Sequence, residues 1–360
     1  MKYRHVKAAL LRSWGLAAAL VASVSLLFTA PVDHRPAPGP PSAAQAWPGA
    51  RRGSLPADLA DGAAYEPGMF FDARASVGSA QTRDGKSLRL VLRHPDGSVR
   101  ELRRLPLGQD PSFQSPTAAG DTLVWVESTR GHLRLWAAGL KDTRPPRQLT
   151  ADTGDLRSYQ SQYDLVVAGG RVHWVAAGPG DTTEIRSVAL AGGAVDIQQR
   201  AGAWALSAWP WLVDGAAAAS GTSRLHDLAT GQDQAVPAGG RAVTACSPVW
   251  CRVVSLARDG STRIELVRPD GSGRRQIAGG TASTVIFDVA VLDRFELFAQ
   301  ISATSDLTGN AELLAYDITT GRTVEISPEA GSVSYRAGVL WWSTGTQGSF
   351  LRHALDLRTV

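Results

Sequence analysis

The chain has 360 residues and a formal net charge of +4, from 37 basic and 33 acidic residues. Residues 1–46 hold five of the basic residues and one acid, so the remaining chain carries 32 of each and is neutral. A neutral domain has no electrostatic reason to bind nucleic acid or an anionic bilayer. Composition therefore argues against both kinds of partner.

Residues 1–30 have the pattern of an export signal. Basic residues from Lys2 to Arg12 precede residues 16–30, an apolar run that contains no charge. A run of about 15 residues is shorter than the roughly 20 that a membrane-spanning helix needs. We therefore predict a signal peptide, or an N-terminal membrane anchor in which residues 16–30 hold the protein at the membrane.

The position of signal cleavage has two candidates. Ala44-Gln45-Ala46 has the small-x-small form of a cleavage site, which predicts a cut after Ala46. A cut after Ala30 would lie closer to the apolar run, but bulky Phe28 lies two residues before it. Either cut predicts an extracellular or cell-surface protein. Residues 31–62, rich in Pro, Ala and Gly, predict a tether that precedes the folded domain.

Residues 120–150 define a unit that the rest of the chain repeats. Thr122–Val126, Leu133–Trp136 and Arg147–Thr150 are short apolar or β-branched runs, bounded by Gly, Asp and Pro. They show no helical period, so they predict three antiparallel strands. So small a sheet cannot cover its own faces and requires similar neighbours.

The repeat continues over residues 63–360. The predicted centres of the second strands lie 37 to 49 residues apart, at Val77, Trp125, Trp174, Trp211, Val253, Leu297 and Trp341. Glycine-containing turns recur after the third strands, at 95–97, 191–193, 229–231, 269–271 and 319–321. Four short strands per unit predict an all-β fold, a single β-propeller of about seven four-stranded blades. Because the first unit is irregular, six blades remain an alternative.

Closing the ring requires a strand from the start of the chain. The sequence ends at Leu355–Val360, where a third strand finishes and an outer strand should follow. We expect the segment 65–72 to supply it, unless that segment is the inner strand of the first blade. A closed ring leaves no exposed sheet edges between its first and last blades.

Two features resemble the TolB-type, WD40-like propeller repeats of bacteria. One is the unit ending Arg147-Gln-Leu-Thr150, and the other is the Pro-Asp-Gly turn that precedes Arg274-Arg-Gln-Ile277. The resemblance covers roughly residues 70–360 and implies an exported scaffold that binds a partner. It carries over no catalytic residue. The scarcity of lysine, with four against many arginines, resembles actinobacterial proteins.

Few residues suggest chemistry. Cys246 and Cys251 are close enough to pair outside the cytosol, which predicts a disulfide, with two buried free thiols as the alternative. No histidine spacing or cysteine–histidine group suits a metal, and no Gly-x-Ser-x-Gly motif occurs. We predict no catalytic residue, no metal and no cofactor.

A repeated Ser-aromatic-Gln-Ser segment precedes the second strand of two consecutive units. It predicts a row of neutral donors and acceptors at one rim of the channel, with turn residues that bond their own backbone as the alternative. Two tryptophans are candidates for a stacking platform, although packing between blades also explains them. The candidate ligand- or partner-binding residues are Ser112, Phe113, Gln114, Ser115, Ser158, Tyr159, Gln160, Ser161, Trp204 and Trp250.

The segments expected at the channel mouth contain no acid, which favours a scaffold over an enzyme. We therefore predict an exported, non-enzymatic, monomeric propeller that binds an unidentified protein or small molecule. The alternative is a carbohydrate- or peptide-active enzyme that uses the central channel.

Overall fold

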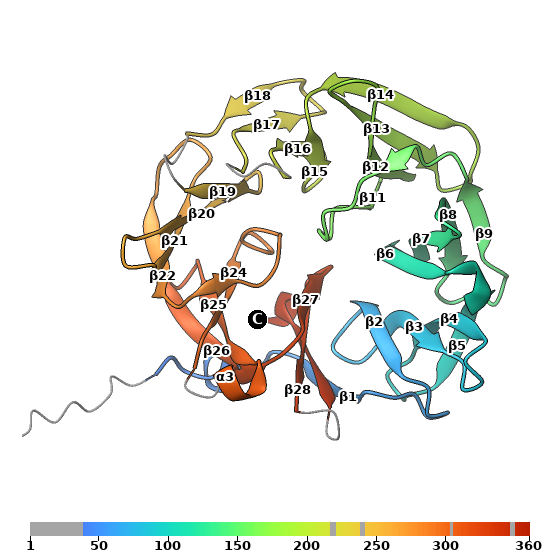
Figure 1. Ribbon diagram of the computed structural model, residues 1–360, viewed down its shortest axis with the longest axis horizontal. Helices are drawn as coiled ribbons and strands as arrows, with labels where there is room; N and C mark the ends of the chain where they lie inside the picture. Colours follow the sequence, from blue (N-terminus) through green and yellow to red (C-terminus); the bar gives the residue numbers. More distant parts are fainter. Residues whose placement is uncertain (1–38, 217–220, 238–241, 303–304, 346–349) are drawn as a thin grey trace, which may run out of the picture. The chain divides into compact units, whose positions relative to one another are not determined.

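The computed structural model describes residues 39–216, 221–237, 242–302, 305–345 and 350–360. Apart from Gly39 and Pro40, these belong to one compact unit, Pro41–Val360. In this unit seven antiparallel sheets follow one another round a ring, in the order of the chain (Figure 1). The unit is a seven-bladed β-propeller, so the predicted fold class is confirmed with seven blades. The predicted signal peptide or anchor, residues 1–30, lies outside the described residues.

The first three blades are formed from consecutive strands. Blade one contains β2 (Tyr65–Phe70), β3 (Ser76–Gln81), β4 (Ser87–Arg93) and β5 (Val99–Pro106). Blade two contains β6 (Ser112–Ala119), β7 (Thr122–Thr129), β8 (His132–Gly139) and β9 (Arg147–Thr150). Blade three contains β10 (Asp155–Leu156), β11 (Val166–Ala168), β12 (Arg171–Ala177), β13 (Thr182–Ala189) and β14 (Val195–Ala201).

The remaining blades follow the same plan until the last. Blade four contains β15 (Trp204–Leu206), β16 (Trp211–Asp214), β17 (Arg224–Asp227) and β18 (Asp233–Ala235). Blade five contains β19 (Val243–Cys246), β20 (Cys251–Leu256), β21 (Thr262–Val267) and β22 (Arg275–Gly280). Blade six contains β23 (Ser283–Thr284), β24 (Phe295–Gln300), β25 (Ala311–Asp317) and β26 (Arg322–Ala330). Blade seven contains β27 (Val333–Arg336), β28 (Val339–Thr344), β29 (Leu351–Asp356) and β1 (Arg52–Pro56).

Among the described residues, four short helices lie outside the sheets. They are α2 (Ala43–Ala46), α3 (Ser305–Thr308) and the 3-10 turns η1 (Leu107–Gln109) and η2 (Leu357–Thr359). Among the described residues, no helix is both long enough and apolar enough to span a bilayer.

The second strand of each blade carries most of the core. In β7, residues Leu123 to Glu127 are all buried, and in β12 residues Val172 to Ala176 are. Both faces of these strands are covered by neighbouring blades, so buried residues follow one another without alternation, and all of them except Glu127 and His173 are apolar. All seven predicted strand centres lie in second strands, and the five predicted turns join third to fourth strands.

The outer strand of blade seven is β1. It pairs antiparallel with β29, from Arg52 opposite Leu355 to Pro56 opposite Leu351. The segment 65–72 is not the donor, because β2 pairs with β3 as the inner strand of blade one, which was the stated alternative. Apolar residues seal the junction: Leu55 shares a buried cluster with Phe70 and Trp341, whose ring centroids lie 5.3 Å apart.

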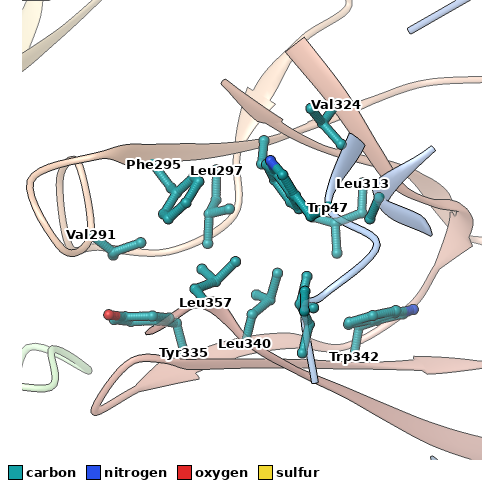
Figure 2. Close-up of a cluster of buried hydrophobic side chains, with 14 of the residues drawn as sticks. Trp47, Val291, Phe295, Leu297, Leu313, Val324, Tyr335, Leu340, Trp342 and Leu357 are labelled. Carbon is teal, nitrogen blue, oxygen red and sulfur yellow. The ribbon is translucent and has the colours of Figure 1, made fainter. Parts of the chain in front are cut away.

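The predicted tether over residues 31–62 is wrong from Pro41 onward, because those residues belong to the folded unit. Helix α2, which precedes β1 in the chain, begins with a capping box in which Ser42 and Gln45 bond each other's backbone. Ala43 and Trp47 then enter a buried cluster with residues of blades six and seven, where Trp47 meets Phe295 edge to face (Figure 2). An outer strand needs little apolar surface, so the composition of this stretch did not reveal it. The proposed cut after Ala46 would remove α2 from this cluster.

Glycine is required at one position of β1. A Cβ added at Gly53 would lie 1.9 Å from the carbonyl oxygen of Ala73, in the turn between β2 and β3. That contact is with backbone, so the two segments would have to separate. Blade seven therefore approaches blade one as closely as a main chain allows.

Candidate functional site

The central channel contains a cavity of about 860 Å³. Every blade contributes described residues to its wall, for example Gly68, Gln114, Ala205, Thr244 and Ser334 from five of them. Inner strands lie around one axis in a propeller, so segments that are far apart in sequence meet here. This cavity is the candidate functional site.

Blade three narrows the channel with an insertion in its inner strand. Both β10 and β11 pair with β12, and residues 158–165 lie between them. In blade two the corresponding interruption is a bulge formed by Ser115 and Pro116. The longer connection in blade three reaches towards the centre of the ring in Figure 1. We refer to residues 158–165 as the insertion.

Two carboxylates hold the insertion in place. Asp164 accepts hydrogen bonds from Ser158 Oγ at 2.5 Å and from the Tyr159 amide at 2.9 Å. Asp288, in blade six, accepts from Ser161 Oγ at 2.6 Å and from the Gln162 amide at 3.2 Å. Asp288 belongs to a blade three positions further round the ring, so these bonds cross the channel.

Blade seven supplies the other contacts to the insertion. The Arg336 guanidinium donates to the carbonyls of Ser161 at 3.1 Å and Gln162 at 3.2 Å. The Ala337 amide donates to Gln162 Oε1. Because Ala337 lies in the turn between β27 and β28, the insertion meets blade seven at the end of the channel where these strands turn.

A buried ion pair lies beside the cavity. Arg252 of β20 contacts Glu296 of β24 at 2.7 Å, and their side chains are 6% and 1% exposed. Arg252 also donates to the carbonyls of Ile286, Phe287 and Asp288. It therefore fixes the segment that carries Asp288, and so positions the anchor of the insertion.

Burial dominates the electrostatics of the wall. It raises the pKa of Asp288 above its ordinary value, and the nearby Asp164 adds to that rise. Burial also lowers the pKa of Arg336 and raises that of Tyr163. The lining carboxylates Asp164 and Asp288 balance the lining cations Arg252 and Arg336, and each of these four groups is already hydrogen-bonded within the protein.

The groups left accessible are uncharged. Phe287 and Val243 line the cavity with 55% and 48% of their surface exposed. Among the described residues no hydrogen-bond partner occurs for the hydroxyl of Tyr159 or the side-chain amide of Gln160. This wall offers apolar contact and neutral hydrogen bonding to a ligand.

Six of the ten predicted binding residues line this cavity: Gln114, Ser115, Ser158, Tyr159, Gln160 and Ser161. The two repeated segments are not structurally equivalent, however. Ser112–Ser115 is part of strand β6, whereas Ser158–Ser161 belongs to the insertion. The expected row of matching residues therefore does not form, and the two segments reach the cavity by different routes.

The other four predicted residues lie outside the cavity wall. Ser112 accepts a hydrogen bond from Gln114 Nε2, and Phe113 packs between blades one and two. Trp204 is 1% exposed, and its indole donates to Ala201 O at 2.7 Å. Trp250 is 5% exposed beneath the Arg268 guanidinium, 3.8 Å from its ring centroid. Neither tryptophan is a stacking platform, because both fill the space between blades.

Four residues of the site were not predicted from the sequence: Asp164, Asp288, Arg252 and Arg336. The segments expected at the channel mouth contain no acid, but the wall of the cavity contains two. None of these four residues recurs at the repeat spacing, so periodicity could not single them out. The one available signal was the extra length of the inner strand in blade three.

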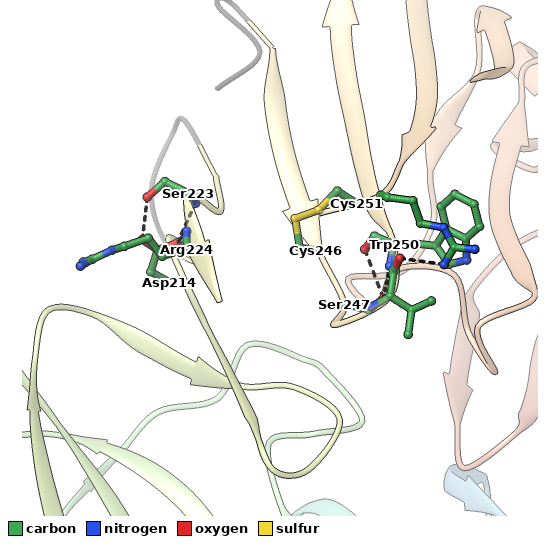
Figure 3. Close-up of a disulfide and its surroundings, with 9 residues drawn as sticks. Asp214, Ser223, Arg224, Cys246, Ser247, Trp250 and Cys251 are labelled. Atoms are coloured by element: carbon green, nitrogen blue, oxygen red, sulfur yellow. Dashed lines mark hydrogen bonds and ion pairs between the residues drawn. A yellow bond between two sulfur atoms is a disulfide. The ribbon is translucent and has the colours of Figure 1, made fainter. Parts of the chain in front are cut away.

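The predicted disulfide is present. Cys246 and Cys251 face each other across the β19–β20 hairpin, with an S–S distance of 2.07 Å (Figure 3). Cys246 also lines the cavity. The disulfide is part of the structure that frames the cavity.

No metal site or histidine-based site is evident in the part of the chain that the structure describes. That part contains no group of three His, Cys, Asp or Glu residues suited to a metal ion. None of its five histidines lines the cavity: His173 stacks on Trp209, for example, and His226 pairs with Asp233.

No family model matches the chain, and no curated protein does. Solved structures are similar to it. A puromycin-hydrolysing peptidase of Mycobacterium tuberculosis is 18% identical over 88% of this chain and 53% of its own, with a TM-score of 0.52. TolB of Acinetobacter baumannii is 11% identical over 75% of this chain and 55% of its own, with a TM-score of 0.31.

A third similar structure is the β-propeller domain of the trilobed protease of Pyrococcus furiosus, 11% identical over 80% of this chain and 81% of its own, with a TM-score of 0.33. The chain spans about half the length of the first solved peptidases that it matches, 46% and 53%. Identities this low concern the fold alone. The fold itself is the seven-bladed β-propeller described above.

Proposed function

We propose that this protein is a non-enzymatic binding scaffold whose ligand or partner segment occupies the central cavity. The observation that carries the proposal is the wall itself. It surrounds about 860 Å³ with accessible apolar and neutral polar groups, while its charged groups are engaged in holding the insertion and the neighbouring blades. A largely preformed, mostly apolar pocket with a few polar groups is the usual form of a binding site.

The ligand is an uncharged group with an apolar part. The lining holds two carboxylates and two guanidinium groups, each hydrogen-bonded within the protein, so an ionic ligand would have to compete with these contacts for a counter-charge. Phe287 and Val243 would contact the apolar part, while Tyr159 and Gln160 would bond its polar atoms. We also propose that the protein acts outside the cytosol, which the Cys246–Cys251 disulfide supports.

The competing proposal is an enzyme of peptide or carbohydrate chemistry, and Asp164 with Asp288 favours it, since both line the cavity. A pair of carboxylates in one cavity can divide the roles of general acid and general base. Against this, each accepts two hydrogen bonds from the insertion. An acid used in this way is already engaged in positioning the chain.

Displayed neutral peptides and neutral glycans, screened against the immobilised chain, test the proposal. A ligand found there should lose at least about tenfold in affinity for Gln160→Ala and Phe287→Ala, and should keep its affinity for Gln232→Ala, an exposed glutamine in blade four. Unchanged melting temperatures would separate lost contact from lost folding.

Mass spectrometry of the bound ligand after prolonged incubation decides between the two proposals. An intact ligand supports the scaffold. Cleavage that disappears in Asp164→Asn and Asp288→Asn would instead establish the enzyme. Hits that bind equally well to the wild-type chain and to both cavity variants would place the binding site elsewhere and refute the proposal.

A further inference from the structure

A second pocket lies at the junction where blade seven meets blade one. It has a volume of about 540 Å³, and its wall contains Arg52, Arg74, Arg93, Trp342 and His353. We call it the seam pocket. Its wall is formed by three parts of the chain: β1, the first blade, and the strands β28 and β29 of blade seven.

The seam pocket concentrates positive charge that nothing in its wall balances. Its lining residues include three arginines and no carboxylate. Several arginines elsewhere in the ring form ion pairs, for example Arg103 with Glu127 and Arg352 with Glu66. Within the described residues no ion pair involves the three arginines of the seam pocket. Since the chain after residue 46 is neutral, this is a local excess.

Main-chain carbonyls position two of these guanidinium groups. Arg52 donates to the carbonyls of Ala43, Trp47 and Ala50, where α2 ends. Arg93 Nη1 donates to the main-chain carbonyl of Arg74 at 3.2 Å, so the side chain of Arg93 lies against the backbone of Arg74. A guanidinium has five N–H donors, and both keep some of them free. The side chain of Arg74 is exposed and has no partner among the described residues.

The nearest acids in sequence are used by their own turns. Asp72 Oδ1 accepts from the amides of Arg74 and Ala75. Asp96 Oδ1 accepts from the amide and hydroxyl of Ser98. Neither residue lines the pocket. Local acids therefore do not neutralise the three arginines.

The remaining wall is neutral and partly aromatic. Both ring nitrogens of His353 are engaged, with Ser54 and Thr344, and burial lowers its pKa, which keeps it uncharged at neutral pH. Its ring stacks on Trp342 with centroids 5.5 Å apart. The indole N–H of Trp342 is buried without a partner, and its nitrogen lies at the end of the ring away from Tyr335 and Leu340 (Figure 2).

We propose that the seam pocket binds a phosphate monoester. Three guanidinium groups suit a doubly charged tetrahedral oxyanion, because arginine N–H groups match its oxygens in geometry and charge. The pocket is larger than an inorganic anion requires, and Trp342 and Pro95 offer apolar surface to the organic part of an ester. The ligand would bridge blades one and seven, independently of the central cavity.

Calorimetric titration of the full chain with phenyl phosphate tests this, at constant ionic strength set with chloride. We expect one saturable site, with phenyl sulfate weaker because it carries one negative charge fewer. Arg74→Gln should weaken phenyl phosphate by at least about tenfold, the effect of losing one charge-assisted hydrogen bond. Arg258→Gln is the matched control, because it removes from a turn of blade five an exposed arginine that has no ion-pair partner among the described residues.

Three results would overturn the proposal. They are the absence of saturable binding, equal affinity in the Arg74→Gln and Arg258→Gln variants, and phenyl sulfate binding as tightly as phenyl phosphate. Because the Arg74 side chain is exposed and forms no contact that folding requires, the melting temperature of Arg74→Gln without ligand should equal that of wild type. That measurement confirms that any lost binding reflects the pocket.

Discussion

Gly53→Ala tests whether β1 closes the ring. The added methyl would lie 1.9 Å from the carbonyl oxygen of Ala73, far inside van der Waals contact. Backbone cannot rotate aside as a flexible side chain does, so β1 and the β2–β3 turn must separate. Overpacking of this kind typically costs 1–3 kcal/mol, and a backbone clash belongs at the upper end, about 3 kcal/mol.

The corresponding change in melting temperature can be calculated. With an unfolding entropy of about 2.1 cal/mol/K per residue over roughly 320 residues, 3 kcal/mol lowers the melting temperature by about 4–5 °C. Thermal unfolding followed by circular dichroism measures it. Gly49→Ala is the control, because an added Cβ there meets nothing within 4 Å.

The comparison between the two glycine variants is decisive. Gly49 and Gly53 lie four residues apart, so both substitutions remove similar chain entropy from the unfolded state. If Gly53→Ala melts at the same temperature as Gly49→Ala, β1 does not pack against blade one as described. The account of ring closure would then be wrong.

Three further predictions follow from the buried groups. Glu296→Gln should destabilise the fold by about 3 kcal/mol, since it leaves Arg252 buried without its counter-charge; chemical denaturation measures this, and a loss below 1 kcal/mol would contradict it. Cys246 and Cys251 should resist alkylation until the protein is reduced, and intact-mass measurement showing two modified thiols beforehand would refute the pairing. Burial raises the pKa of Asp288 in the folded state. Between the pKa of this carboxyl in the unfolded chain and its higher pKa in the folded protein, only the folded protein keeps the proton, so wild-type stability falls as pH rises through this range. Asp288→Asn should remove this fall, so its stability relative to wild type should increase with pH across the acid range and then level off; a constant difference in urea unfolding would argue against it.

The sequence predicted the repeating part of this structure well. Strand centres such as Trp125 and Trp174 lie in apolar runs bounded by turn residues, so local pattern and packing agree. The same logic failed for β1, where a single buried residue, Leu55, provides most of the apolar contact of the strand. An outer strand paired on one edge leaves almost no pattern in its own sequence.

The candidate site was predictable only where it shared the repeat. Gln114 and Gln160 were identified because the Ser-aromatic-Gln-Ser segment occurs twice, and both line the cavity. The two copies are not structurally equivalent, since the insertion begins where blade two has only Ser115 and Pro116. Asp288 and Arg336 lie more than 120 positions after the insertion they hold. Contacts that cross a ring cannot be found from local spacing.

The pairing of β1 with β29 also governs how this chain can assemble. Arg52 must find Leu355 at the opposite end of the sequence, and closing a loop of about 300 residues costs roughly 3 kcal/mol more than closing one of ten. Until the last strands exist, β1 has no partner, and afterwards the outer edge of β29 accepts any strand of the same sequence. At high concentration, the β1 strand of a second molecule competes for that edge. Strand exchange between copies, with each N-terminal strand completing the other's last blade, is the characteristic misassembly of a ring closed in this way.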